Sequence, residues 1–200
     1  PIYNRGFHDI TDLTLETDVV VELTGDVIAT SASHVPMIRA GAEEHLTHTI
    51  EFSLAEVAEN PRATRALVLN DTNLIIVVSL SLTYAHIFSA QLRANSTTPW
   101  GAFMSGLRVE LELPGPGEDE LTANLTFVNN SPYGYSFWLE ALNDLNQTLG
   151  TSEAFNVDPG DIFDETITMT IDTSLWTGSG SLLVHLSLGS VVLDVEVARY

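Results

Sequence analysis

Apolar and polar residues alternate with a period of two along most of this chain. The clearest example is "DLTLETDVVVELTG", residues 12–25. Side chains at every second position of an extended strand lie on the same face, so one face of this segment would be apolar and the other acidic. The pattern predicts a half-buried β-strand. Its apolar row comprises Leu13, Leu15, Val19, Val21 and Leu23.

Further alternating segments follow, separated by turn-forming clusters of Gly, Pro, Asn and Asp. The alternating segments are 49–54, 107–113, 121–127, 135–141 and 167–171, and the clusters are 114–120, 129–134, 157–161 and 177–181. About ten short strands with this spacing are typical of sandwiches and barrels. We therefore predict an all-β fold, a single jelly-roll-like β-sandwich with minor helical turns near residues 54–60 and 141–147.

Residues 72–92 contain no Asp, Glu, Lys or Arg over a length that could span a bilayer. Polar residues such as Asn73, His86 and Gln91 interrupt the run, however, and its large apolar residues mostly share one parity. This favours long or bent β-structure over a transmembrane helix.

The segment from residue 180 to the C-terminus predicts a hairpin that turns at Gly189-Ser190. In that register Leu188 faces Val191 and His185 faces Asp194. All the residues of one face are then apolar, and they are Leu182, Val184, Leu186, Leu188, Val191, Leu193, Val195 and Val197. The alternative is one long strand with a bulge at Gly189.

The length of 200 residues fits a single domain over residues 12–200, preceded by a lead-in segment at 1–11. The chain has 27 acidic residues, seven arginines and no lysine, for a net charge of −20. Such a charge argues against binding to nucleic acid and against insertion into an anionic membrane. It also suggests an extremophile source. With no cysteine, disulfides and thiolate metal sites are excluded.

Signals of catalysis are sparse, and we predict that the protein is not an enzyme. The chain has no P-loop, GxGxxG, GxSxG or HExxH motif. His45 and His48 are three residues apart and would lie on opposite faces of a strand. His185 opposite Asp194 could form the base half of a catalytic triad, but a polar cross-strand pair is the commoner meaning of this arrangement.

Acidic loop residues suggest one cofactor, calcium. Asp158, Asp161 and Asp164 surround a Pro-Gly turn, and hard cations take oxygen ligands from such loops. The alternative is that these are solvated turn charges.

The sequence also contains more N-x-S/T sequons than its composition predicts by chance. This indicates either a glycosylated surface protein or simply a β-protein rich in Ser and Thr. The candidate asparagines are Asn70, Asn95, Asn124, Asn129 and Asn146.

An alternating strand near the start of the sequence can serve assembly in two ways. It can close its own sheet, or it can complete the sheet of a neighbouring subunit by strand addition. In the second case residues 12–25 would be the donor strand, and the row from Leu13 to Leu23 would fill the pockets of the acceptor.

The segment "VDPGDIFDETITMTID", residues 157–172, together with the amphipathic strand at 12–25, resembles the donor-strand filament subunits of archaeal surfaces. These are the thread and bundling-pilus proteins, related in fold to TasA/camelysin biofilm fibres. The resemblance implies an extracellular pilus or filament subunit whose partners are copies of itself.

Two other classes stay open. One is a jelly-roll capsid or virion-surface protein, for which the strand count is suitable. The other is a carbohydrate-binding sandwich, in which Tyr133, Trp100, Trp138 and Trp176 would stack on sugars.

Overall fold

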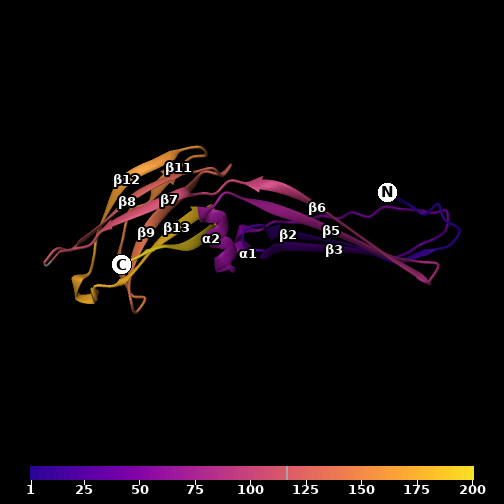
Figure 1. The fold of residues 1–200 in the computed structure, drawn as a ribbon, viewed down its shortest axis with the longest axis horizontal. Helices are drawn as coiled ribbons and strands as arrows, with labels where there is room; N and C mark the ends of the chain where they lie inside the picture. Colours follow the sequence, from indigo (N-terminus) through magenta and orange to yellow (C-terminus); the bar gives the residue numbers. More distant parts are fainter. Residues whose placement is uncertain (116) are drawn as a thin grey trace. The chain divides into compact units, whose positions relative to one another are not determined.

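The computed structural model describes residues 1–115 and 117–200 and consists mostly of antiparallel β-sheets (Figure 1). This confirms the predicted all-β class, whereas a jelly-roll topology is not confirmed. The chain divides into two compact units. The first unit contains residues 1–53 and 73–98, and the second contains residues 54–72 and 99–200. The expectation of one sandwich over residues 12–200 did not anticipate this division.

The first unit is built on a four-stranded sheet in the order β3-β2-β5-β6, with β1 and β4 forming a separate pair. The strands are β1 (Ile2–Tyr3), β2 (Ile10–Val21), β3 (Val27–Ile38), β4 (Glu43–Glu44), β5 (Thr72–Tyr84) and β6 (Phe88–Trp100). The predicted strand at 12–25 is β2. It ends at Val21, whose carbonyl accepts the N–H of Gly25 in a tight turn.

Residues 72–92 form β-structure, as predicted, but as parts of two strands that meet in a hairpin. The turn centres on Ala85 and His86, which have φ angles of 54° and 57°. Positive φ at both central residues is the type I′ geometry, whose twist matches that of paired strands. No helix among the described residues is long and apolar enough to cross a bilayer.

The predicted strand at 49–54 is wrong, because residues 45–53 form an irregular segment. Side-chain hydrogen bonds attach this segment to β3 and β2. Ser33 donates to the Thr47 carbonyl, and the His48 ring lies 2.9 Å from both Ser33 Oγ and Thr17 Oγ1. Its neighbour His45 contacts Glu43 instead, so the two histidines point to different partners.

The second unit is a two-layer sandwich. One sheet has the order β10-β9-β13-β14 with β11 also paired to β9, and the other has the order β12-β8-β7. The strands are β7 (Ser105–Glu112), β8 (Glu120–Val128), β9 (Tyr135–Asn143), β10 (Thr148–Thr151), β11 (Phe155–Val157), β12 (Ile162–Thr170), β13 (Gly180–Leu188) and β14 (Val191–Arg199). Phenylalanine rings from both sheets meet in the core. Phe137 lies 5.6 Å from Phe127 and 5.0 Å from Phe163, measured between ring centroids.

Two helices, α1 (Leu54–Ala58) and α2 (Pro61–Leu69), contact β14, and α2 also contacts β7. The helix predicted at 54–60 is therefore present. Asn60 caps α2 by accepting the N–H groups of Arg62 and Ala63. A short 3-10 helix, η1 (Thr173–Leu175), follows β12. The helical turn predicted at 141–147 is wrong, because β9 continues to Asn143 and a turn follows it.

The hairpin β13–β14 confirms the register predicted from the sequence, including His185 opposite Asp194 and Leu188 opposite Val191. The register shifts at the far end, so that Leu182 faces Ala198 rather than Val197. Both strands still direct their apolar rows into the core, because a bulge changes the pairing without exchanging the two faces over the rest of the hairpin.

Candidate functional site

The predicted donor strand lies at the centre of its own sheet. Over most of its length β2 pairs with β3 on one side and with β5 on the other. Most of its apolar row is buried within this unit: Leu13, Val19 and Val21 are buried and Leu15 is half-buried. Leu23 lies beyond the strand and is 58% exposed. In this structure β2 therefore closes its own sheet, the first of the two arrangements considered from the sequence.

The edge of the same sheet is β6. Twelve of its 13 residues are exposed, and its only charged residue is Arg93. Strand β6 is the last in the order β3-β2-β5-β6, so one side of its backbone has no strand partner within the described sheet. An edge strand of this length presents N–H and C=O groups to which another strand can pair.

The opposite edge, β3, differs from β6 in two ways. Pro36 lies within β3 and cannot donate to a further strand. In addition, the segment at 45–53 is attached to β3 through Ser31 and Ser33. Proline and a covering loop are common means by which β-proteins block an edge. Between residues 88 and 98, β6 has neither proline nor such a segment among the described contacts.

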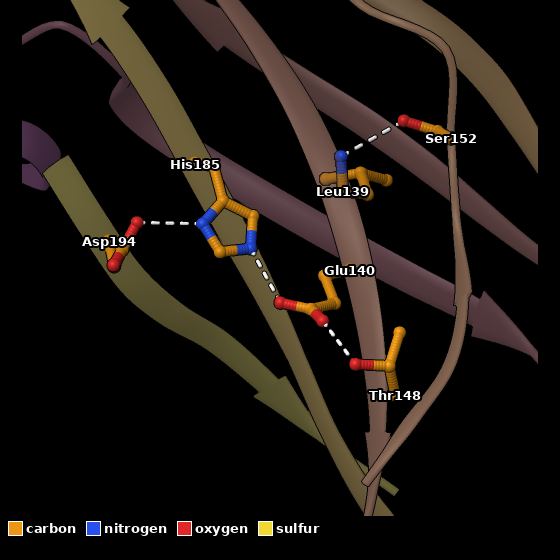
Figure 2. A network of polar contacts seen from close by, with 6 residues as sticks. All are labelled: Leu139, Glu140, Thr148, Ser152, His185 and Asp194. Atoms are coloured by element: carbon orange, nitrogen blue, oxygen red, sulfur yellow. Dashed lines mark hydrogen bonds and ion pairs between the residues drawn. The ribbon is translucent and has the colours of Figure 1, made fainter. Parts of the chain in front are cut away.

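The second unit carries a polar network on the sheet formed by β9, β13 and β14, shown in Figure 2. His185 lies between two carboxylates, with Nδ1 2.6 Å from Asp194 Oδ1 and Nε2 2.8 Å from Glu140 Oε2. Glu140 also accepts a hydrogen bond from Thr148. The His185 ring stacks on Trp138 at 5.0 Å. The network thus ties together three neighbouring strands and β10.

The geometry of His185 suits structure better than catalysis. Both ring nitrogens lie within hydrogen-bond distance of a carboxylate oxygen. Each nitrogen is thus already engaged by a carboxylate and not by the hydroxyl of a nucleophile. The Ser152 hydroxyl accepts the Leu139 N–H, as Figure 2 shows. It also donates to the Glu153 carbonyl. The predicted cross-strand pair is present, and Glu140 is the member that the sequence did not reveal.

The structure does not bring the predicted calcium ligands together. Asp161 accepts the N–H of Asp158 and so closes its own turn, while Asp164 accepts a hydrogen bond from Thr126 on β8. Over residues 1–115 and 117–200, no three His, Asp or Glu side chains are grouped so that they could hold a metal ion. Two of these carboxylates, Asp161 and Asp164, thus serve as local acceptors. Calcium binding by Asp158, Asp161 and Asp164 stays a prediction.

The sequons differ in accessibility. Asn129 is fully buried, and its Nδ2 donates to the carbonyls of Tyr133 and Asp158, so a glycan there would disrupt the turn. Asn124 is half-buried within β8. The remaining candidates are exposed, and they are Asn70, Asn95 and Asn146.

The tryptophans proposed for sugar stacking are engaged within the second unit. Trp176 stacks on Tyr200, Trp138 stacks on His185, and Trp100 meets Phe103 edge to face. Tyr133 is 51% exposed. The rings thus form no exposed planar row of the kind that sugars stack on, within the part of the chain that the structure describes.

Asp71 is a structural residue that the sequence did not reveal. Its carboxylate accepts the Ala102 N–H, the Ser105 hydroxyl and the Asn130 amide, all within 2.8 Å. Partial burial raises the pKa of Asp71, but these three hydrogen bonds together outweigh it and hold the pKa below its ordinary value. Because its partners are distant in the chain, no local pattern could have identified the residue.

Comparison with known proteins does not assign this chain to a family. No protein-family model and no curated protein matches it. Among solved structures, red sea bream transglutaminase is similar over 99% of this chain and 28% of its own, with 16% identity and a TM-score of 0.36. The chain therefore spans little more than a quarter of that enzyme, and a likeness this weak carries no argument about function.

Proposed function

We propose that this protein is a non-enzymatic structural subunit that assembles with copies of itself into an extracellular filament or pilus. The observation that carries the proposal is the exposed edge strand β6. Backbone pairing along such an edge supplies much of the affinity in strand addition. The likeness of residues 12–25 and 157–172 to archaeal surface-filament subunits supports the extracellular setting.

The distribution of charge favours the same strand. Two copies of a chain with net charge −20 repel each other unless they meet where acids are few. Between Asp71 and Glu110 the sequence contains no Asp or Glu, and this interval includes all of β5 and β6. Contact along β6 therefore brings no carboxylate of β5 or β6 into the interface.

This proposal moves the assembly element from the strand at 12–25 to β6. Deleting residues 1–24, which would test donation of β2, removes a central strand and would unfold the first unit. A sharper test leaves every strand in place. Gln91→Glu with Asn95→Asp adds two negative charges to β6 with almost no change in side-chain shape.

We expect the unaltered protein to form filaments visible by negative-stain electron microscopy, and the double variant to remain monomeric by light scattering at low salt. Added salt should restore part of the assembly, because it screens the new repulsion. Asn146→Asp with Asn156→Asp is the matched control, since it adds the same charge at exposed sites of the second unit. Closed shells would favour the capsid class instead, and a monomeric unaltered protein would overturn self-assembly.

A further inference from the structure

Three large apolar side chains are exposed at one end of the first unit. Phe7 is 95% exposed, Ile87 78% and Phe88 67%. Phe7 lies in the loop after β1, and the other two follow the turn between β5 and β6. The two segments lie side by side in Figure 1 and are joined by hydrogen bonds. We call these three residues the apolar tip.

Hydrogen bonds hold Phe7 in its exposed position. The hydroxyl oxygen of Tyr84 accepts the N–H groups of Phe7, at 3.1 Å, and of His8, at 3.3 Å. The Ala85 N–H donates to the Asp9 carbonyl. A side chain at Gly6 would place its Cβ only 2.5 Å from the Tyr84 hydroxyl oxygen, so the Tyr84 ring would have to shift from this position.

A buried asparagine completes the support of this loop. Asn4 is 3% exposed, and its Nδ2 donates to the carbonyls of His8 and Ile38. Its Oδ1 accepts the N–H of Gly6. The backbone on both sides of Phe7 is thus fixed to the sheet. A fixed side chain loses little conformational freedom when it is buried by a partner.

The hairpin of the apolar tip differs in charge from the rest of the chain. It carries Ile87 and Phe88 and has no acid, and Arg5, His8 and His86 flank the tip. Four carboxylates lie on the neighbouring segments: Asp9 accepts the Ala40 N–H, Glu43 contacts His45, and Asp12 and Glu44 are exposed. Most of the net charge of −20 lies outside the hairpin, which is the segment that carries two of the three apolar side chains.

We propose that the apolar tip inserts into the surface of a lipid bilayer, with Arg5 at the level of the phosphate groups. Protruding aromatic and aliphatic side chains beside a cationic one fit the boundary between headgroups and acyl chains. A second copy would need an apolar socket. The hollows described in the second unit have mixed linings that include charged residues, such as Arg65 and Asp71 in one and Glu118 and Asp119 in another.

The test uses tryptophan fluorescence with vesicles of phosphatidylcholine, either plain or brominated on the acyl chains. Phe7→Trp places an indole at the apolar tip, and Val27→Trp places one at a half-exposed position of β3 in the same unit. Bromine quenches only a fluorophore within the bilayer. Using both variants in the Gln91→Glu/Asn95→Asp background removes assembly through β6, so the result does not depend on the proposed function.

We expect brominated vesicles to quench the Phe7→Trp variant and to leave the Val27→Trp variant unchanged. Adding Ile87→Ser and Phe88→Ser should weaken vesicle binding at least about tenfold, because each substitution removes apolar surface from the lipid contact. Equal quenching of both variants, or no quenching of either, would overturn the proposal. Circular dichroism of each variant checks that the fold is unchanged.

Discussion

The two units of this protein bury the apolar faces of their strands in different ways. In the second unit two sheets face each other, and Phe127, Phe137 and Phe163 fill the space between them. The first unit has one large sheet and a small buried cluster around Leu13, Val35 and Ile38, which is supported by half-buried neighbours. The comparison shows that alternation alone specifies strands but not the number of layers they form.

The two units also differ in how the edge strands of their sheets are covered. In the second unit α1 and α2 cover the side where β14 and β7 lie, and α2 adds Val68 to the core. In the first unit β3 is protected by Pro36, whereas β6 is exposed along almost its whole length. We therefore expect stability to be concentrated in the second unit and contacts with partners in the first.

We expect the largest effect on stability from a substitution in the aromatic core of the second unit. Phe137→Ala should lower the free energy of unfolding of the second unit by about 3–5 kcal/mol, since it removes contacts with three other rings and leaves a cavity. Chemical denaturation followed by tryptophan fluorescence reports this unit, which contains every tryptophan. Leu13→Ala is the counterpart in the first unit. Equal effects of both variants on the fluorescence transition would contradict the division into two units.

The His185 network should give the next largest effect. His185→Gln can keep at most part of the hydrogen bonding between Asp194 and Glu140. We expect a loss of about 1.5–3 kcal/mol from the second unit. The matched control is His34→Gln, on an exposed position of β3. If both variants behave alike in thermal unfolding, the bridge does not stabilise the sandwich.

The hairpin turn of the first unit offers a stabilising change. Ala85 and His86 both adopt left-handed φ angles, which side chains with a Cβ rarely favour. The double variant Ala85→Asn/His86→Gly introduces the Asn-Gly pair that type I′ turns prefer. We expect the first unit to gain about 1–2 kcal/mol. Hydrogen exchange of the β5 and β6 amides would reveal the gain, and unchanged exchange would contradict it.

Asp71 should make a smaller contribution that depends on pH. Because its pKa is below the ordinary value, the folded state binds a proton less readily than the unfolded state. Its stabilisation is complete above the unfolded pKa and is lost as pH falls through the folded one. Asp71→Asn should cost about 1 kcal/mol at neutral pH. In urea titrations at several pH values, this cost should diminish under acidic conditions, and a cost that stays constant with pH would contradict the role of the carboxylate.

The sequence predicted the elements of the second unit better than those of the first. In β8, β9 and the β13–β14 hairpin, alternation is strict because one face packs against the opposite sheet. Strand β3, "VIATSASHVPMI", was missed because small and polar side chains interrupt its pattern. Helix α2 was missed although Asn60 followed by Pro61 is a typical helix start.

The candidate sites were harder to predict, because they depend on which elements become neighbours. The register of the β13–β14 hairpin predicted that Asp194 lies opposite His185. Glu140, the partner on the other side, is 45 residues away in sequence, and its position depends on sheet order. In the same way, alternation identified the strand at 12–25 but could not show that β5 would pair with its second edge.

The smallest expected effect distinguishes folding from assembly. If β6 is an exposed edge, Gln91→Glu/Asn95→Asp should change the free energy of unfolding of the monomer by no more than about 0.5 kcal/mol, because neither side chain is buried. The same pair of substitutions is expected to abolish assembly. Denaturation at a concentration where the unaltered protein is monomeric measures the free energy of unfolding of the monomer. Light scattering at high concentration measures assembly. A large loss of monomer stability would mean that β6 already has a partner within its own chain, and the edge proposed for assembly would then be occupied.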